Sequence, residues 1–143
     1  MNIWSITLLA EEATVLRILF IEDDLLSAGF ILARLMREED ENFDPLYRVL
    51  HASTLTEARQ RLAAGDIDLL VSDTCVDANE PDAHLLVQEV RRTWPDLPII
   101  GMSSSNFSEP VMRQAGVNEF YQKSFNDLNF DGLVALVKQL LPD

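Results

Sequence analysis

The chain has 143 residues, enough for one domain with a sizeable core and too few for two full domains. Its composition, 48% hydrophobic and 24% charged, is that of a globular protein and excludes wholesale disorder. With 11 Lys and Arg against 24 Asp and Glu, the formal net charge of −13 disfavours binding to nucleic acid or to an anionic membrane surface. The single Cys excludes a disulfide framework and a Cys-based zinc site, and it indicates a reducing, cytoplasmic setting.

Residues 1–15 precede the first predicted strand. They are mildly hydrophobic but lack a basic start and contain Glu11 and Glu12, which makes a poor signal peptide. No apolar run in the sequence reaches the length of a membrane span. We therefore expect an N-terminal extension over residues 1–15, helical or disordered, followed by one domain over residues 16–141.

Short, almost continuous apolar runs alternate with amphipathic segments five times along the chain. Such runs are typical of parallel strands that helices cover on both faces. The predicted strands are residues 16–21, 47–51, 67–71, 97–102 and 119–122.

The segments after the strands have helical periodicity. Steps of three and four predict a helix between Asp24 and Arg37 with an inward-facing stripe of Leu25, Ala28, Leu32 and Leu35. Thr54 and Glu57 form a capping box at the start of a second helix, which we expect to end at Gly65.

Three further helices follow. Leu86, Val90 and Trp94 mark the third, closed by Pro95, and we assign Trp94 to the core. The fourth begins near residues 108–110 and ends at residue 116. We expect Asn129 to cap the last helix, whose inner face is Phe130, Leu133, Val137 and Leu140.

This order of elements predicts an α/β fold, a five-stranded parallel sheet with helices on both faces. Ligands of such sheets bind at the carboxyl ends of the strands. Polar side chains follow four of the predicted strands, namely Glu22, Asp23 and Asp24, then Ser72, Asp73 and Thr74, then Ser103, Ser104 and Ser105, and finally Lys123.

Carboxylates gathered at one sheet edge raise each other's pKa unless a cation joins them. Oxygen ligands without His or Cys suit Mg²⁺, which accepts one or two carboxylates together with waters and phosphate oxygens. Lys123 and Ser103 add an ammonium and a hydroxyl able to hold phosphoryl oxygens. Each residue alone has an ordinary role, such as a helix cap, but the combination predicts phosphoryl transfer to a carboxylate.

Four segments, residues 17–24, 68–73, 98–104 and 116–123, resemble those of response-regulator receiver domains of two-component signalling. The resemblance covers about residues 16–141. It implies a flavodoxin-like (βα)5 fold and a phosphoprotein that works in phosphorelay signal transduction.

The resemblance also implies a role for each site residue. Asp73 is the phosphoacceptor, Lys123 the essential lysine, and Phe120 the aromatic switch. Ser103 bonds the phosphoryl group and also takes part in the switch, and Ser104 leaves room for that group. The ligands that it implies for Mg²⁺ are Asp23, Asp73, the main-chain carbonyl of Cys75, and Glu22 through water.

A receiver of this kind accepts its phosphoryl group from a sensor histidine kinase or a histidine phosphotransfer protein. It is a phosphoacceptor that assists its own phosphorylation and dephosphorylation rather than an enzyme in the usual sense. Phosphorylation switches a protein-interaction surface. We expect output through a downstream protein target or a relay, unless the chain is part of a longer one.

Three departures from the family pattern stand out. Residues 75–81 are atypical after the acceptor, and Ser124 stands where a cis-proline is usual, so we expect a trans peptide there. Surplus length before Asp73 is expected in an acidic, solvated loop over residues 38–45.

Two alternatives remain open. One is a phosphorylation-independent pseudo-receiver, a binding module with this fold. The other is an aspartate-nucleophile phosphohydrolase, which the missing Asp-x-Asp spacing and the lack of room for a cap domain disfavour. Cys75 is expected to be an inert thiol, and His51 and His84 to be surface residues.

Overall fold

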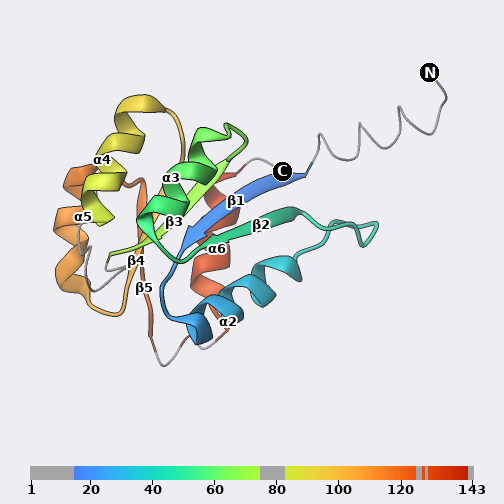
Figure 1. Ribbon diagram of the computed structural model, residues 1–143. Coiled ribbons are helices and arrows are strands. Elements are labelled where there is room, and N and C mark those ends of the chain that lie inside the picture. Colours follow the sequence, from blue (N-terminus) through green and yellow to red (C-terminus); the bar gives the residue numbers. More distant parts are fainter. Residues whose placement is uncertain (1–14, 75–82, 125–126, 128, 142–143) are drawn as a thin grey trace, which may run out of the picture.

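The computed structural model describes residues 15–74, 83–124, 127 and 129–141, and the expectations for Cys75 and for residues 1–14 lie outside these ranges. The described chain forms a twisted sheet between two layers of helices (Figure 1). Its strands are β1 (Leu16–Ile21), β2 (Tyr47–Ala52), β3 (Leu69–Asp73), β4 (Ile99–Ser103) and β5 (Glu119–Gln122). Its helices are α2 (Leu25–Met36), α3 (Leu55–Ala63), α4 (Ala83–Thr93), α5 (Glu109–Ala115), α6 (Asp131–Leu140) and a 3-10 turn, η1 (Asn106–Ser108).

All strand pairs are parallel and the strand order is β2-β1-β3-β4-β5, which confirms the predicted fold class. The order reverses at β1, since β2 lies on one side of it and β3 on the other. The helices that follow β1 and β3 therefore lie on opposite faces of the sheet. Ligands of such sheets bind in the crevice between the carboxyl ends of these two strands.

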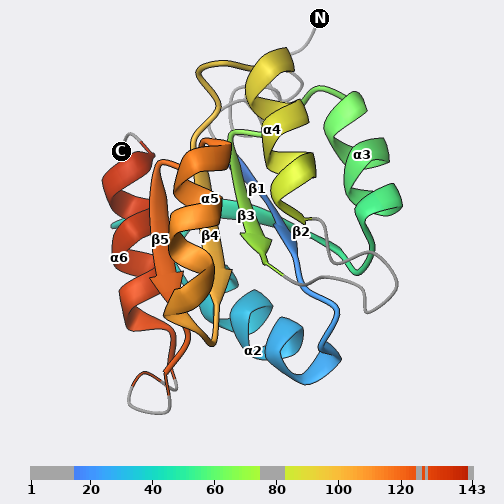
Figure 2. The ribbon, with the colours of Figure 1, turned by 90° about the vertical axis from the view of Figure 1, so that its left-hand side faces the viewer.

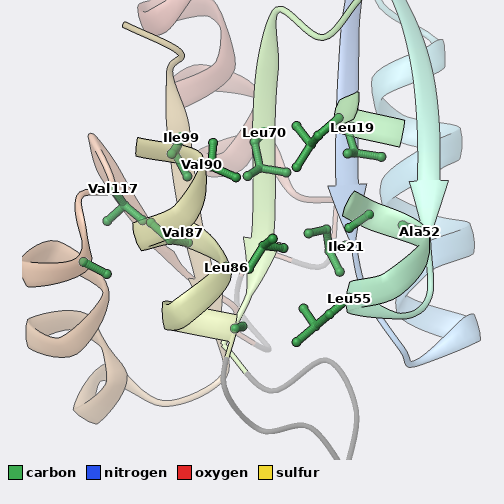
Figure 3. Packing of buried hydrophobic residues seen from close by; sticks show 14 of the residues in the cluster. Leu19, Ile21, Ala52, Leu55, Leu70, Leu86, Val87, Val90, Ile99 and Val117 are labelled. Atoms are coloured by element: carbon green, nitrogen blue, oxygen red, sulfur yellow. The ribbon is translucent and has the colours of Figure 1, made fainter. Parts of the chain in front are cut away.

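The continuous apolar runs of the strands fill two cores because alternate side chains point to opposite faces. Leu19, Leu70 and Ile99 face α3, α4 and α5, as Figure 3 shows from close by. Residues next to them in the chain, such as Ile18 and Ile100, face α2 and α6. Figure 2 shows α3, α4 and α5 on one side of the sheet and α2 on the other.

Two residues assigned to inward faces are exposed instead. Leu25 is 75% exposed, and the buried stripe of α2 is Ala28, Ile31 and Leu35. The first turn of α2 directly follows the carboxyl end of β1, and only its later turns run back along the sheet. Trp94 is 36% exposed because α4 ends at Thr93, one residue before it.

The helix caps agree with prediction in two cases and differ in one. The Thr54 hydroxyl accepts a hydrogen bond from the Glu57 N–H at 3.1 Å, and α5 ends at Gly116 with a φ of 122°. Asn129 is not the cap of α6. The Asp127 carboxylate accepts the N–H groups of Asp131 and Gly132 instead, both at 2.9 Å.

The surplus loop lies between α2 and β2, where it was predicted, and residues 39–45 are exposed. Asp40 Oδ1 organises it by accepting the N–H groups of Asn42 and Asp44. His51, expected at the surface, is half-buried with its ring stacked on Phe20 at 4.8 Å between ring centres. None of the described helices is long and apolar enough to span a membrane.

Candidate functional site

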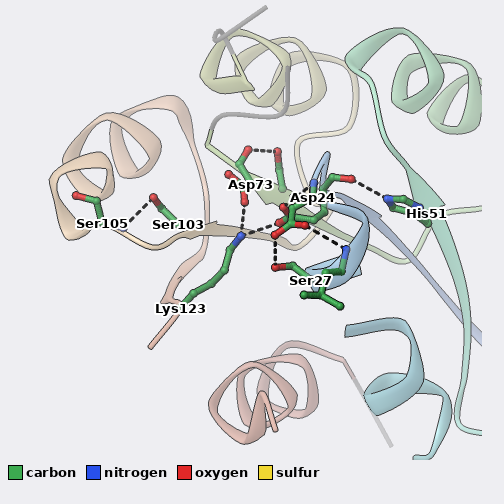
Figure 4. Close-up of polar contacts among 10 residues, drawn as sticks. Asp24, Ser27, His51, Asp73, Ser103, Ser105 and Lys123 are labelled. Atoms are coloured by element: carbon green, nitrogen blue, oxygen red, sulfur yellow. Dashed lines mark hydrogen bonds and ion pairs between the residues drawn. The ribbon is translucent and has the colours of Figure 1, made fainter. Parts of the chain in front are cut away.

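The carboxyl ends of β1, β3 and β5 bring together three charged side chains that lie far apart in the sequence. The Lys123 ammonium donates to Glu22 Oε2 at 2.7 Å and to Asp73 Oδ2 at 2.6 Å. Figure 4 shows the lysine reaching across the sheet edge toward Asp73, with the second dashed line running to the acidic segment after β1. The predicted convergence of carboxylates and an ammonium is therefore present.

Glu22 is held from several sides. Its side chain is 2% exposed, and its Oε1 accepts the Asp24 N–H at 3.2 Å. Its main-chain carbonyl lies 2.8 Å from His51 Nε2, which donates in the tautomer protonated there. Because both the backbone and the carboxylate are fixed, Glu22 presents one oxygen to the crevice in a set direction.

The electrostatics of the site follow from its burial. Burial first, and the neighbouring Asp73 second, raise the pKa of Glu22 to about 7, although Lys123 acts to lower it. Burial also acts to lower the pKa of Lys123, but the two carboxylates outweigh it and the pKa of the ammonium is raised. The site therefore holds more carboxylate than one ammonium can neutralise, and it favours a further cation.

Asp73 is the last residue of β3 and is 7% exposed. Its main chain is fixed, since the Ser72 hydroxyl donates to its carbonyl at 3.0 Å and the Thr74 N–H donates to the Met102 carbonyl at 2.9 Å. A carboxylate on a rigid strand end beside a lysine is suited to act as a nucleophile.

The serines after β4 differ in environment. Ser103 is buried, and its hydroxyl accepts the Ser105 N–H at 3.1 Å (Figure 4). Its carbonyl accepts the Lys123 N–H at 2.7 Å, which ties β4 to the end of β5. Ser104 is exposed. The described structure thus holds the Ser103 hydroxyl against its own loop.

Phe120 on β5 is half-buried and packs on the core that faces α4 and α5. It lies beside Gly101 of β4, where an added Cβ would come within 3.2 Å of the ring. Gly101 therefore leaves the space that the aromatic ring occupies.

The predicted magnesium ligands are partly placed. Glu22 and Asp73 converge, Asp23 is exposed directly beside Glu22, and the Cys75 carbonyl lies outside the described residues. In the described ranges, no group of three or more His, Cys, Asp or Glu is arranged to hold a metal ion. Since Mg²⁺ commonly takes one or two protein carboxylates and fills its remaining positions with water and phosphate oxygens, this donor set fits a wet magnesium site.

The supporting roles of two residues were not predicted from the sequence. Ser105 holds the Ser103 hydroxyl, and His51 holds the Glu22 carbonyl. The serine run gave a weak signal for the first, whereas pairing of β2 with β1 was needed to find the second. The Lys123–Ser124 peptide is trans, as expected for a residue other than proline.

His84 is half-buried rather than at the surface. It lines a cavity of about 230 Å³ between the start of α4 and the start of α5, together with Thr74, Phe107, Ser108, Val111 and Met112. Because Thr74 directly follows the predicted acceptor, this cavity adjoins the site.

No protein-family model matches the chain, and a search of curated proteins found no significant match. Solved structures do match. TrrA of Thermotoga maritima, a response regulator in complex with Mg²⁺ and BeF, is 24% identical with a TM-score of 0.75, covering 89% of this chain and 100% of that one.

Two further matches are also receivers. The receiver domain of a sensor histidine kinase from Pseudomonas aeruginosa, with magnesium in its active-site cleft, is 20% identical, with a TM-score of 0.70 and coverage of 88% and 97%. The phosphorylated cyanobacterial phytochrome response regulator RcpA is 20% identical, with a TM-score of 0.69 and coverage of 88% and 91%. The chain thus has the fold of response-regulator receiver domains.

Proposed function

We propose that this protein is a two-component receiver that accepts a phosphoryl group on Asp73 from a histidine kinase or a histidine phosphotransfer protein. The observation that carries the proposal is the contact of one ammonium, Lys123 Nζ, with both Asp73 and Glu22 at the carboxyl edge of the sheet. The fold shared with known receivers supports it.

In the proposed reaction, a carboxylate oxygen of Asp73 attacks the phosphorus of a phosphohistidine, and the bond from phosphorus to the imidazole nitrogen breaks as the new P–O bond forms. Lys123 already lies against the nucleophile, so its ammonium can move to a phosphoryl oxygen as negative charge passes there. Asp73, Asp23, the Cys75 carbonyl and, through water, Glu22 would hold Mg²⁺, which would supply further neutralisation of phosphoryl charge. The product is an acyl phosphate and a free histidine.

The proposed response is a shift between two existing states. The Ser103 hydroxyl leaves the Ser105 N–H and donates to the phosphoryl group, while Ser104 leaves room for it. Phe120 then moves into the space behind Ser103. Phe120 lies on β5 and Lys123 directly follows that strand. Because both residues are attached to β5, this movement alters the surface formed by α5, β5 and α6. A downstream protein that prefers one state reads the change.

Intact mass measurement tests the transfer. The full chain is incubated with phosphoramidate, a small phosphodonor, with Mg²⁺ or with EDTA. We expect a gain of one phosphoryl group that requires Mg²⁺, is lost in alkali, and is absent in Asp73→Asn. The matched control is Asp66→Asn, because Asp66 is exposed and pairs with Arg17 at the opposite end of the sheet.

Other outcomes favour the alternatives. No phosphoryl gain together with no Mg²⁺ binding would indicate the pseudo-receiver, a binding module that acts without phosphorylation. Turnover of a generic phosphate ester would indicate the phosphohydrolase. We further propose a cytoplasmic location, where kinase and phosphotransfer partners act, and an N-terminal extension over residues 1–15 outside the receiver domain.

A further inference from the structure

Helix α2 is apolar on the side that faces solvent as well as on the side that faces the core. Its six exposed residues are Leu25, Leu26, Gly29, Phe30, Ala33 and Met36. None carries a polar side chain, and the other four described helices each expose charged residues. An exposed apolar face of this kind is normally covered by a partner.

The outer face of α2 is shaped for a close neighbour. At mid-length it carries the small residues Gly29 and Ala33 beside the exposed Phe30, and an added Cβ at Gly29 would have no atom within 4 Å. Larger side chains stand at both ends of the face, with Leu25 and Leu26 in the first turn and Met36 in the last. A second helix can therefore approach near the middle while its own end residues pack against these.

The ends of α2 are also complementary to one another. Asp24 is the exposed N-cap residue, and the exposed Arg37 is the C-cap residue. Within the described part of the chain, no carboxylate forms an ion pair with the Arg37 guanidinium. An antiparallel helix with the same pattern would place Asp against Arg at both ends and would align the helix dipoles favourably.

We propose that this face is an interface between two copies of the chain, formed by antiparallel packing of α2 on α2 about a two-fold axis. In such an isologous contact each residue meets its counterpart from the other end of the helix. Leu25 lies opposite Met36, and Asp24 lies opposite Arg37. The two-fold axis crosses the helix pair at the level halfway between Phe30 and Ile31 along each helix. The proposal does not depend on the phosphorylation proposed above.

A cavity at the edge of this face supports the geometry. It has a volume of about 110 Å³ and is lined by Phe30, Ala33, Arg34, Arg37, Asn129 and Phe130. In the antiparallel arrangement, the first turn of the second α2 lies over the last turn of the first. Leu26 of one copy can then fill the cavity of the other, and Asp24 can reach the arginine on its rim.

The mass of the full chain in solution tests the proposal. Sedimentation equilibrium is measured in EDTA without phosphodonor at concentrations up to about 1 mM, the weak limit for specific association. We expect the mass to rise from one chain to two. Ala33→Glu should abolish the dimer, because like charges would face each other near the axis. Ala63→Glu, which makes the same change at an exposed position of α3, should leave it intact.

Cysteine pairs test the orientation, in a Cys75→Ser background that removes the only native thiol. Leu25→Cys combined with Met36→Cys should give a disulfide-linked dimer, whereas neither change alone should. Within one helix these positions lie about 16 Å apart, too far for a disulfide.

Three results would overturn the proposal: a single-chain mass over the whole range, an equal effect of both glutamate variants, or dimerisation that appears only when residues 1–14 are removed. The last would identify that segment as the occupant of the face.

Discussion

The ammonium of Lys123 lies between two buried carboxylates, 2.6 Å from Asp73 Oδ2 and 2.7 Å from Glu22 Oε2. The three side chains come from the ends of β5, β1 and β3, so the ion pairs hold the carboxyl edge of the sheet together. When all three groups are ionised, the cluster carries one negative charge more than its ammonium neutralises. That excess is the electrostatic basis for expecting a divalent cation there.

Removing the ammonium should destabilise the protein in a pH-dependent way. Lys123→Met leaves two carboxylates together in a buried place, and we expect a loss of about 3 kcal/mol in the free energy of unfolding at pH 8. The loss should shrink at pH 5, where Glu22 is protonated and the repulsion is gone. Urea denaturation without metal measures both values.

The control for this variant is Lys138→Met, which breaks an exposed ion pair with Glu38. It should cost less than about 1 kcal/mol at either pH. Equal losses for the two variants would show that Lys123 contributes no more than a surface charge.

The raised pKa of Glu22 should make the metal-free protein less stable as pH rises. In the unfolded chain this carboxyl titrates near 4.5, whereas in the folded protein its pKa is about 7. Between these values the folded state retains a proton that the unfolded state has lost, so the free energy of unfolding falls with increasing pH. We expect the free energy of unfolding to fall by about 3 kcal/mol through this group, with the fall complete just above pH 7.

Glu22→Gln should remove this decline, since glutamine does not titrate. Glu109→Gln, a change at a carboxylate on the outer side of α5, should leave the slope as it is in the unmodified protein. An unchanged slope in Glu22→Gln, measured by urea denaturation in EDTA from pH 4 to 8, would contradict the assignment. Added Mg²⁺ should reduce the decline by favouring the ionised carboxylate.

The sheet and its polar edge were predictable because local pattern determines them. Strands covered on both faces must be apolar at nearly every position, so the strands were visible in the sequence to within two residues, and the polar residues at their carboxyl ends converge in any parallel sheet. The predicted strands 67–71 and 97–102 are Leu69–Asp73 and Ile99–Ser103 in the structure, so Asp73 and Ser103 are the last residues of their strands. Glu22, Asp73 and Lys123 were found in this way. Ser103 was also identified, and its hydroxyl lies against Ser105 in this structure.

Features that depend on contacts between distant segments were not predictable. The periodicity that includes Leu25 does not reveal that the first turn of α2 has no sheet beside it. Asn129 is a good capping residue by type, yet Asp127 forms the cap of α6 because the Tyr121 hydroxyl, from β5, fixes its carboxylate at 2.6 Å. The stacking of His51 on Phe20 likewise requires the register of β2 on β1.

Arg91 connects three segments by hydrogen bonds to main-chain carbonyls. Its guanidinium donates to the carbonyls of Pro95, Leu97 and Gly116 and to the Asn118 side chain, at 2.7 to 3.1 Å. In the Arg91→Lys variant, the lysine ammonium cannot donate to all of these acceptors at once. We therefore expect a loss of about 2 kcal/mol in the free energy of unfolding.

The neighbouring Arg92→Lys is the control, because Arg92 is exposed and should tolerate the change within about 0.5 kcal/mol. Thermal and urea denaturation compare the two variants. Phosphoryl gain from phosphoramidate should be unaffected in both, since Arg91 lies at the end of the sheet opposite the site. A similar stability for the two variants would show that the carbonyl contacts of Arg91 contribute little.

Asp127 couples β5 to the start of α6 and should do so only while ionised. The Tyr121 hydroxyl and the N–H groups of Gly132 and Asp131 lower the pKa of its carboxyl, although burial acts the other way. A carboxyl with a lowered pKa stabilises the fold above its unfolded pKa and loses that effect as pH falls through its folded value. Because the amide replaces a charged acceptor by a neutral one, Asp127→Asn should therefore cost about 1 kcal/mol at pH 7 and progressively less below pH 4.

Tyr121→Phe tests the contribution of the hydroxyl separately from that of the two backbone donors. It should raise the pKa of Asp127 toward that of an ordinary aspartate, which NMR titration of the carboxyl carbon measures, while the two N–H donors keep their bonds. Hydrogen exchange at Asp131 and Gly132 should speed up strongly in Asp127→Asn and only slightly in Tyr121→Phe. If both variants accelerated exchange equally, the tyrosine hydroxyl would be as necessary to the cap as the carboxylate, and the prediction would be wrong.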